Sequence, residues 1–392
     1  MHPPGAGTVV VRHGDLNVKS TGVQRRMERR LVENVEALLA AAGVDATVEQ
    51  PWSRILVRTD EAQVEAATEA AAKAFGVVSA SPALSVPSER EAITEALVAT
   101  ARAHYDGGTF AVNARRSEKS LPFDSEDAQR WGGQAIWEAV EDDFEPAVDL
   151  DDPDLTFHVE IRGDETFVFL EHVDGPGGLP LGTQAPMVAL VSGGIDSPVA
   201  AFELMRRGSP VVPVYVDLGD YGGPDHEARA VETVRTLAEY APNFDLTLWK
   251  VPAGDVVAAL VDAVETGRML VFRRFLYVVG ELIAGETAAA GVVTGEALGQ
   301  KSSQTGQNFA VTSQAIDLPV HRPLLTWDKA DIVEAARDIG TFHDSTIPAG
   351  CNRMVPAQPE THGSVAAVAA AEPDDLRERA REAVERAERV SF

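Results

Sequence analysis

The chain has 392 residues, of which 45% are hydrophobic and 24% are charged. This length allows two or three compact domains, and the composition excludes a chain that is disordered throughout. The 61 Asp and Glu residues outnumber the 34 Lys and Arg residues, giving a formal net charge of -27. No uncharged apolar run of about 18 residues and no signal peptide occurs, which predicts a soluble, cytoplasmic protein with no membrane partner.

The excess of carboxylates predicts a cytoplasm of very high salt. The Debye length falls to about 3 Å at 1 M salt, so dense surface charges repel each other little there. Net charge therefore does not exclude RNA binding, which depends on local clusters of basic residues. Two such clusters occur, one on the helix expected from residue 21 and one after the strand expected at 109–114: Arg25, Arg26, Arg29 and Arg30; then Arg115, Arg116 and Lys119.

The first part of the chain alternates short strands and helices. The hydrophobic pattern predicts strands at 8–18, 55–58, 77–83, 109–114, 155–161 and 166–170, and helices from 21, at 61–75 and at 89–104. Pro82 is expected to end the strand that contains it. The residues from Arg162 to Glu165 predict a hairpin turn, and the Gly- and Pro-rich stretch 174–182 predicts a domain boundary.

Beyond this boundary the order of elements changes. Strands are expected at 187–191, 211–216, 245–251 and 292–294, with helices at 198–207, 227–239, 256–265, 269–290 and 330–339. This alternation predicts a doubly wound parallel α/β domain. The charged amphipathic segment 373–390 is expected to form a solvated helical tail.

One glycine-rich loop carries the strongest chemical signal. The strand expected at 187–191 leads into Ser192, Gly193, Gly194, Ile195, Asp196 and Ser197, followed by a helix. Glycines let backbone N–H groups close around phosphate oxygens, the serines add hydroxyl donors, and a helix N-terminus favours an anion. The loop lacks the Lys of a Walker motif and resembles the SGGxDS loop of the PP-loop ATP pyrophosphatases. The alternative is a tight glycine turn between core elements.

Three further positions are chemical candidates. Asp196, beside the expected phosphates, suits a Mg²⁺ ligand or a group that positions the substrate. Lys329 stands at the start of a helix, where a cation is unfavourable unless an anion is nearby; the alternative is a surface lysine paired with a neighbouring aspartate. Cys351 is the single cysteine, which excludes an intramolecular disulfide, and it lies in a loop containing Pro and Gly. A solitary cysteine is more often a small buried hydrophobe than a nucleophile.

Taken in order, the motifs resemble those of the tRNA 4-thiouridine synthetases, also called thiamine-biosynthesis sulfurtransferases, across nearly the whole chain. The matching segments are residues 11–16 with Lys19 and Ser20, 109–110 with 115–116, 130–133, 182–184, 192–197, 205–208, 294–305, 322–329 and 346–361. The resemblance implies an N-terminal ferredoxin-like domain at 1–58, a THUMP RNA-binding domain at 59–172 and a PP-loop catalytic domain at 173–392.

The resemblance also implies site residues. The catalytic acid corresponds to Asp196 and the important lysine to Lys329, while Ser192, Gly193, Gly194 and Ser197 form the phosphate loop. The family's contacts with ATP fall on Leu190, Val191, Tyr215, Val216, Arg273, Gly295 and Gln304. Cys351 falls on the position that receives sulfur from a persulfide in bacterial members.

The activity that the resemblance implies is ATP- and Mg²⁺-dependent adenylation of a tRNA uridine, expected at position 8, followed by replacement of its C4 oxygen with sulfur. The chain ends without the rhodanese-like domain of bacterial members, so a separate sulfur donor is the expected partner beside tRNA. A role in thiamine thiazole synthesis is secondary, and a homodimer stays open. The alternatives are another PP-loop tRNA-modifying enzyme, of the 2-thiouridine or lysidine type, and a non-catalytic tRNA-binding module.

Overall fold

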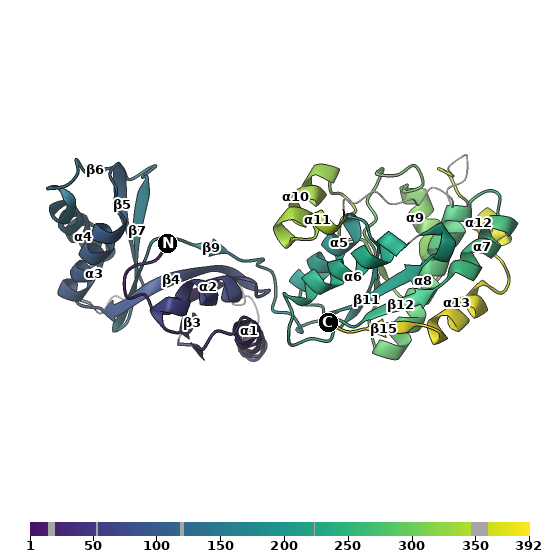
Figure 1. Cartoon of the computed structure of the whole chain (residues 1–392), viewed down its shortest axis with the longest axis horizontal. Helices are drawn as coiled ribbons and strands as arrows, with labels where there is room; N and C mark the ends of the chain where they lie inside the picture. The colour runs from purple at the N-terminus through teal and green to yellow at the C-terminus, as the bar shows by residue number, and fades with distance from the viewer. Residues whose placement is uncertain (15–19, 52–53, 118–120, 223, 346–359) are drawn as a thin grey trace. The chain divides into compact units, whose positions relative to one another are not determined.

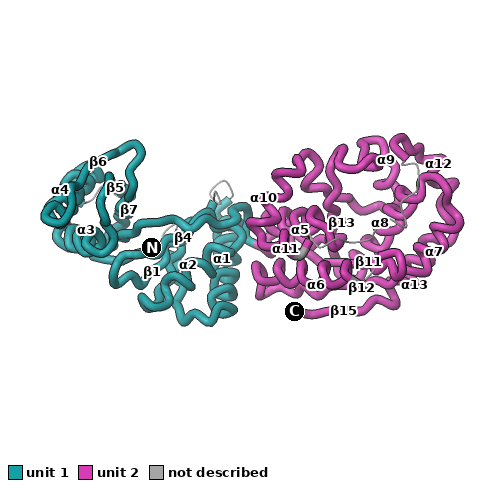
Figure 2. Tube along the Cα trace, turned by 45° about the horizontal axis from the view of Figure 1, so that its top comes forward, with its two compact units in different colours: residues 1–180 teal, residues 181–392 magenta. Residues whose placement is uncertain are grey.

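The computed structural model describes residues 1–14, 20–51, 54–117, 121–222, 224–345 and 360–392. The chain divides into two compact units, residues 1–180 and residues 181–392 (Figure 2). Each unit has its own sheet and its own hydrophobic core. The change in pattern seen near residue 180 in the sequence is therefore a change from one folding unit to the next.

The first part of unit 1 packs helices on an antiparallel sheet (Figure 1). Its elements are β1 (Thr8–His13), α1 (Thr21–Ala41), β2 (Thr47–Glu49), β3 (Ile55–Arg58), the 3₁₀ turn η2 (Glu61–Gln63), α2 (Val64–Ala72) and β4 (Val77–Pro87). The core forms because α1 buries Leu31, Val35 and Leu38 at helical spacing against the strands. The opposite side of α1 leaves Arg25, Arg26 and Arg29 exposed.

The expectation that Pro82 ends its strand is wrong. β4 continues to Pro87, and Pro82 lies opposite Val9 of β1. On the other edge of β4, Ser79 and Ala80 pair with β9 (Val173–Asp174), whereas Leu84 and the residues after it pair with β8 (Glu165–Phe169). Pro82 falls in the gap between these two ladders, where a residue that lacks an N–H donor is tolerated.

The second part of unit 1 is a sheet with two helices on one face. It contains α3 (Arg90–His104), β5 (Thr109–Arg116), α4 (Ser125–Val140), β6 (Ala147–Val148), β7 (Leu155–Arg162) and β8. Alternate residues of β5 and β7, such as Phe110 and Phe157, are buried beneath the helices. The sequence pattern had not predicted α4, which begins at a capping box between Asp124 and Asp127.

Unit 2 is a parallel sheet covered by helices on both faces, and its strand order is β14-β13-β10-β11-β12-β15. The strands are β10 (Met187–Val191), β11 (Val211–Asp217), β12 (Leu248–Pro252), β13 (Val292–Val293), β14 (Val320–His321) and β15 (Glu388–Val390). All neighbouring pairs are parallel except β12 with β15. The chain moves outward from β10 through β11 to β12 and returns to the other side of β10 with β13. This reversal creates a switch point between β10 and β13.

The helices of unit 2 are α5 (Asp196–Arg206), η3 (Gly219–Tyr221), α6 (Pro224–Ala238), α7 (Gly254–Ala263), α8 (Arg268–Thr287), α9 (Gly306–Ser313), α10 (Lys329–Ile339), α11 (Phe342–Ser345), α12 (Val365–Ala371) and α13 (Leu376–Glu385). The five helices expected in unit 2 correspond to α5, α6, α7, α8 and α10, whereas η3, α9, α11 and α12 were not predicted. The long helix α8 is central, because Phe275, Tyr277 and Val279 are almost fully buried in the core. The doubly wound α/β fold predicted from the sequence is confirmed.

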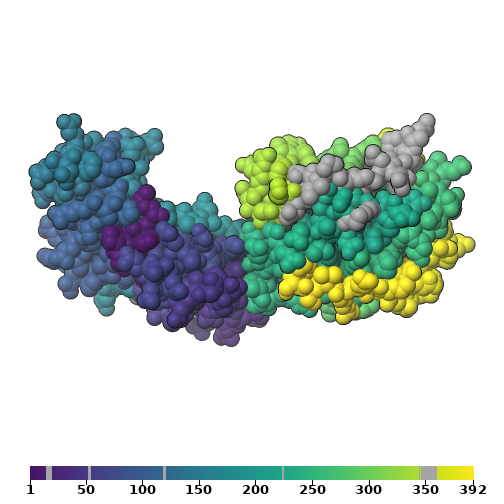
Figure 3. Space-filling model, in the orientation of Figure 1, coloured from purple at the N-terminus to yellow at the C-terminus, as the bar shows by residue number. Residues whose placement is uncertain are grey.

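The C-terminal segment is not a solvated tail. Leu376 of α13 is 1% exposed, and Ala380 and Ala383 are fully buried in the core that contains α8. β15 then pairs with β12, with Val390 opposite Leu248. Figure 3 shows this segment, in yellow, lying along unit 2. Most residues of α13 are charged, so its narrow apolar face, which packs against the core, is not evident from the sequence.

None of the helices in the described part of the chain is long and apolar enough to cross a membrane.

Candidate active site and basic pocket

The glycine-rich loop of unit 2 is closed by its own serines. The Ser192 N–H donates to the Ser197 hydroxyl at 2.8 Å, and the two serine hydroxyl oxygens lie 3.1 Å apart. The Gly194 N–H donates to the Ser192 hydroxyl at 3.3 Å. The loop thus connects the end of β10 to the first turn of α5, which begins at Asp196. Backbone N–H groups and a helix N-terminus meet at this point.

Two glycines lie in close packing around this loop, and the one at 295 leaves no space for a Cβ. A Cβ at Gly193 would lie 3.1 Å from the His226 carbonyl oxygen. A Cβ at Gly295, which follows β13, would lie 2.6 Å from the Asp196 carbonyl carbon and 2.7 Å from the Ser197 nitrogen. Real side chains do not fit at such distances, so any larger residue at 295 would move the phosphate loop. The loop after β13 and the glycine-rich loop therefore pack directly against each other and form one site.

A cavity of about 330 Å³ opens beside the loop, at the carboxyl ends of β10, β11 and β13. Its size and its place at the switch point of a parallel sheet are typical of a nucleotide site. The structure places in its wall all of the residues for which the resemblance implied ATP contacts or phosphate-loop membership: Leu190, Val191, Ser192, Gly193, Gly194, Ser197, Tyr215, Val216, Arg273, Gly295 and Gln304. Asp196 lies in the same wall.

Asp196 and Lys329 form an ion pair at this site. The Lys329 ammonium donates to Asp196 Oδ1 at 2.5 Å, and the side chains are 51% and 28% exposed. Lys329 therefore contacts neither Asp328 nor Asp331, the partners that a surface lysine at this helix start would have. The pair brings together residues 133 positions apart in the sequence. It holds a positive and a negative group beside the phosphate loop.

A buried carboxylate, Glu296, connects the walls of the cavity. Its side chain is 8% exposed and lies 3.1 Å from Arg273 Nε and 3.0 Å from Arg322 Nε. Tyr277 donates its hydroxyl to the same carboxylate, and burial together with the Glu296 charge raises the pKa of Tyr277. Arg273 also donates to the Ser303 carbonyl oxygen at 2.9 Å. The sequence pattern missed Glu296 as a functional residue, although it stands next to Gly295.

The loop that carries Gln304 is fastened from outside the cavity. The Asn308 amide donates to the Ser303 carbonyl oxygen at 3.0 Å and to the Glu360 carbonyl oxygen at 2.9 Å, and it accepts from the Gly363 N–H at 2.9 Å. Glu360 and Gly363 are therefore tied to Asn308 of α9, which follows the Gln304 loop. Cys351, the remaining predicted site residue, lies outside the described residues.

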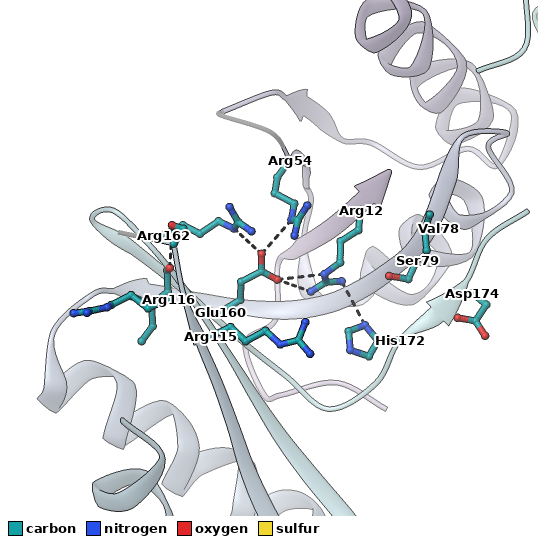
Figure 4. A pocket seen from close by; sticks show the side chains of 12 residues that line it. Arg12, Arg54, Val78, Ser79, Arg115, Arg116, Glu160, Arg162, His172 and Asp174 are labelled. Carbon is teal, nitrogen blue, oxygen red and sulfur yellow. Dashed lines mark hydrogen bonds and ion pairs between the residues drawn. The ribbon is translucent and has the colours of Figure 1, made fainter. Parts of the chain in front are cut away.

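Unit 1 contains a basic pocket of about 420 Å³. Figure 4 shows Arg12, Arg54 and Arg162 converging on the carboxylate of Glu160. The ion-pair distances are 2.8 Å for Arg12, 3.1 Å for Arg54 and 2.6 Å for Arg162. Burial raises the pKa of Glu160, but the three guanidinium groups outweigh burial and lower this pKa to about 2. Arg115 and Arg116 also line the pocket, so its positive charges exceed its negative ones.

Two histidines lie on the same side of the sheet. His158 stacks on Phe169 with ring centroids 5.0 Å apart, and His172 lies edge-on at 4.9 Å from His158. Burial, His172 and the nearby Arg12 and Arg115 lower the pKa of His158 to about 4. Burial and Arg12 also lower the pKa of His172. Both rings are therefore neutral near pH 7, which leaves the arginines as the positive charges of the pocket.

The fold and the site define the class of the protein. Unit 2 is a doubly wound α/β domain with a PP-loop at its switch point, joined to an N-terminal unit with a basic pocket. Three family profiles match in chain order: the ThiI ferredoxin-like domain at residues 8–81, the THUMP domain at 88–171 and the thiamine biosynthesis protein (ThiI) at 182–375.

Similar proteins carry one name. A probable tRNA sulfurtransferase of Halobacterium salinarum is 61% identical over 381 residues, covering 97% of this chain and 96% of the relative. A probable tRNA sulfurtransferase of Methanosarcina acetivorans is 39% identical, covering 90% of this chain and 85% of the relative. A crystal structure of a 4-thiouridine synthetase–RNA complex with bound ATP superposes with a TM-score of 0.86 at 26% identity, covering 99% of this chain and 100% of the other. The chain belongs to the tRNA sulfurtransferase family of enzymes.

Proposed function

We propose that the protein is an ATP-dependent tRNA sulfurtransferase that converts uridine, at position 8, to 4-thiouridine. The observation that carries the proposal is the PP-loop beside a nucleotide-sized cavity, with the Asp196–Lys329 pair at the loop. The similarity to a 4-thiouridine synthetase crystallised with RNA and ATP, over the full length of both chains, supports the same assignment. A lysidine synthetase would share the loop, but the named relatives are sulfurtransferases over nearly their whole length. The full-length similarity to a 4-thiouridine synthetase favours 4-thiouridine over the 2-thiouridine product.

The residues of the cavity fit ATP. The N–H groups of the loop and of the α5 N-terminus suit the phosphates, and the apolar parts of Leu190, Tyr215 and Val216 suit the base. Arg273, Gly295 and Gln304 complete the wall, with Arg273 oriented by Glu296 and Ser303. The resemblance assigns contacts with the nucleotide to these residues, and their arrangement around one cavity supports the assignment.

Mg²⁺ is compatible with the same loop. This ion typically binds one or two carboxylates together with the phosphates of its nucleotide, and Asp196 supplies a carboxylate beside the loop. The described residues contain no group of three or more His, Cys, Asp or Glu that could hold a metal by themselves. When bound with ATP, the ion would neutralise phosphate charge.

The chemistry proceeds in two displacements. The C4 oxygen of uridine attacks the α-phosphorus of ATP, pyrophosphate leaves, and the oxygen becomes part of a good leaving group. Lys329 then stabilises the negative charge of the phosphates, while Asp196 keeps Lys329 in place and orients the reacting groups. A hydrosulfide equivalent adds at C4, AMP leaves with the oxygen, and loss of a proton gives the thiocarbonyl.

The sulfur is proposed to come from a separate donor. Cys351 is proposed to carry it as a persulfide, whose terminal sulfur displaces AMP from C4 and leaves a C4–S–S–Cys351 disulfide that an external thiol reduces to 4-thiouridine. Alternatively, the Cys351 thiolate resolves the corresponding disulfide between C4 and the donor, forming a mixed disulfide with the donor that an external thiol reduces, because the thiolate is the reactive form of cysteine. A part in thiamine thiazole synthesis rests on the family profile alone and is a secondary proposal.

The substrate tRNA is proposed to bind unit 1 through its phosphates. The pocket that contains Arg12, Arg115 and Arg116 and the exposed arginines of α1 are concentrations of positive charge in a chain with a net charge of -27. Such clusters attract the RNA backbone independently of sequence. This arrangement divides the work: unit 1 holds the RNA, and unit 2 performs the reaction.

The test is tRNA-dependent AMP formation and 4-thiouridine yield with sulfide as the donor, in molar KCl. The wild type is expected to perform both steps, whereas Asp196→Ala is expected to perform neither. Cys351→Ser is expected to form 4-thiouridine with sulfide, because free sulfide replaces the relay. A wild type that binds tRNA tightly but forms no AMP with any tRNA would instead identify a non-catalytic tRNA-binding module.

A further inference from the structure

Arg229, in the first half of α6, is a buried cation. Its residue is 5% exposed, and its Nε and Nη2 atoms are buried with no hydrogen-bond partner among the described residues. Arginine stays protonated at any physiological pH, so it cannot avoid the cost of burial by losing its charge. Burying an unpaired charge costs several kcal/mol, and natural proteins rarely accept this cost without a use for the group.

Two of the three carboxylates of α6 are engaged elsewhere, and the third, Asp225, is exposed. Glu227 forms an ion pair with Lys250 at 2.8 Å, and Glu232 forms one with Arg235 at 3.2 Å. Arg229 has no carboxylate within ion-pair distance in the described part of the chain, although acidic residues greatly outnumber basic ones in the sequence. The described part of the chain therefore provides no anion for Arg229.

The side chain of Arg229 runs along the phosphate loop. A Cβ built at Gly193 would lie 3.2 Å from both Cβ and Cδ of Arg229. Since Nε is bonded directly to Cδ, the guanidinium begins one bond from this contact. The Arg229 charge also acts on a residue of the cavity wall: burial, followed by Arg229, lowers the pKa of His226.

We propose that Arg229 is a phosphate-binding residue of the ATP site, which pairs with the pyrophosphate portion of the nucleotide from the Gly193 side of the loop. Lys329 serves the same loop at Asp196, so the departing pyrophosphate lies between two cations from different helices. The unmade hydrogen bonds of the guanidinium are completed when the anion binds, which makes the interaction charge-assisted and directional. This inference rests on the proposed use of ATP.

The test compares Arg229→Met, Arg229→Lys and the wild type, with Arg235→Met as the control on the exposed side of the same helix. Inorganic pyrophosphate and ATP are titrated by calorimetry in molar KCl, and melting temperatures are measured with and without them. Arg229→Met is expected to melt a few degrees above the wild type without ligand, because it removes an unpaired buried charge. It is expected to bind pyrophosphate at least 10-fold more weakly, with Arg229→Lys in between and Arg235→Met unchanged.

Several outcomes would overturn the inference. Wild-type affinity for pyrophosphate in Arg229→Met shows that the guanidinium does not contact the anion. A lower melting temperature or failure to fold of this variant identifies a structural arginine with an internal partner. If the wild type binds neither pyrophosphate nor ATP, the proposed ATP chemistry fails together with this inference. If the wild type binds them and Arg229→Met binds them equally well, only the role of Arg229 is overturned.

Discussion

The basic pocket of unit 1 and the cavity of unit 2 differ in how their charged residues are paired. In the pocket of unit 1, one carboxylate, Glu160, is shared by Arg12, Arg54 and Arg162, and Arg115 adds further positive charge. In the cavity of unit 2, Asp196 has its own cation, Lys329, and the phosphate loop consists of glycines and serines. An excess of cations, as in the pocket of unit 1, attracts any nucleic-acid phosphate backbone. Oriented N–H groups and a single ion pair, as in the cavity of unit 2, stabilise charge on one reacting group. Net charge therefore says little about either function.

The largest expected effect is on AMP formation in Lys329→Gln, a variant that should change the reaction in unit 2 without changing tRNA binding. Lys329→Gln removes the cation that stabilises phosphate charge and leaves Asp196 unpaired, so tRNA-dependent AMP formation should fall by about 100-fold. The affinity for tRNA should stay within about twofold of wild type, because the RNA is proposed to bind unit 1. Radiolabelled AMP release and filter binding measure the two quantities.

The control for Lys329→Gln is Lys73→Gln, which removes an exposed lysine from unit 1. It should leave AMP formation unchanged. Equal losses of tRNA affinity and AMP formation in Lys329→Gln would show that the two functions are not divided between the units.

A core substitution tests whether the C-terminal segment belongs to unit 2. Leu376→Ala deletes a side chain that is 1% exposed in the core shared by α13 and α8. The free energy of unfolding should fall by about 3 kcal/mol, the usual cost of such a cavity. Denaturant unfolding in molar KCl measures it, with the exposed Glu385→Ala as the control. No loss of stability would return this segment to the solvated tail predicted from its charge pattern.

A change in unit 1 should weaken RNA binding without affecting the chemistry of the bound complex. Arg115→Gln removes an exposed guanidinium from the basic pocket. The affinity for tRNA should fall about 10-fold, and the plot of log K against log salt concentration should become shallower by about 0.7 to 0.9. The exposed Arg102→Gln on α3 is the control. An unchanged salt slope would place the RNA elsewhere on the molecule, and a changed ATP affinity would contradict the division between units.

The smallest effect is a pH dependence that belongs to unit 1. His158 has a pKa of about 4 in the folded protein, against an ordinary value of 6.5. Between these values the unfolded chain binds a proton that the folded protein does not, so the free energy of unfolding falls as the pH is lowered from 7 to 4.5. Because the ring is partly exposed, the contribution is on the order of 1 kcal/mol. His158→Gln should flatten the pH profile by this amount; a profile parallel to wild type would contradict it.

The sequence by itself determined the features that are encoded within a few consecutive residues. The phosphate loop is readable because Ser192 to Ser197 lie between one apolar strand and one helix, so the backbone geometry follows from local chemistry. The alternation of strands and helices likewise predicted the doubly wound sheet. The surface position of Arg25, Arg26 and Arg29 followed from helical periodicity.

Only the tertiary structure decided the features that depend on long-range pairing. Glu296 became a hub because the fold brings Arg273 and Arg322 to one carboxylate, and no local pattern predicts which ions meet. β15 completes the sheet edge because of its register with β12, far back in the chain, although its own segment reads as charged helix. Pro82 stays in a strand because two neighbouring ladders leave it a gap. In each case the deciding partner is distant in sequence, whereas periodicity reports only on near neighbours.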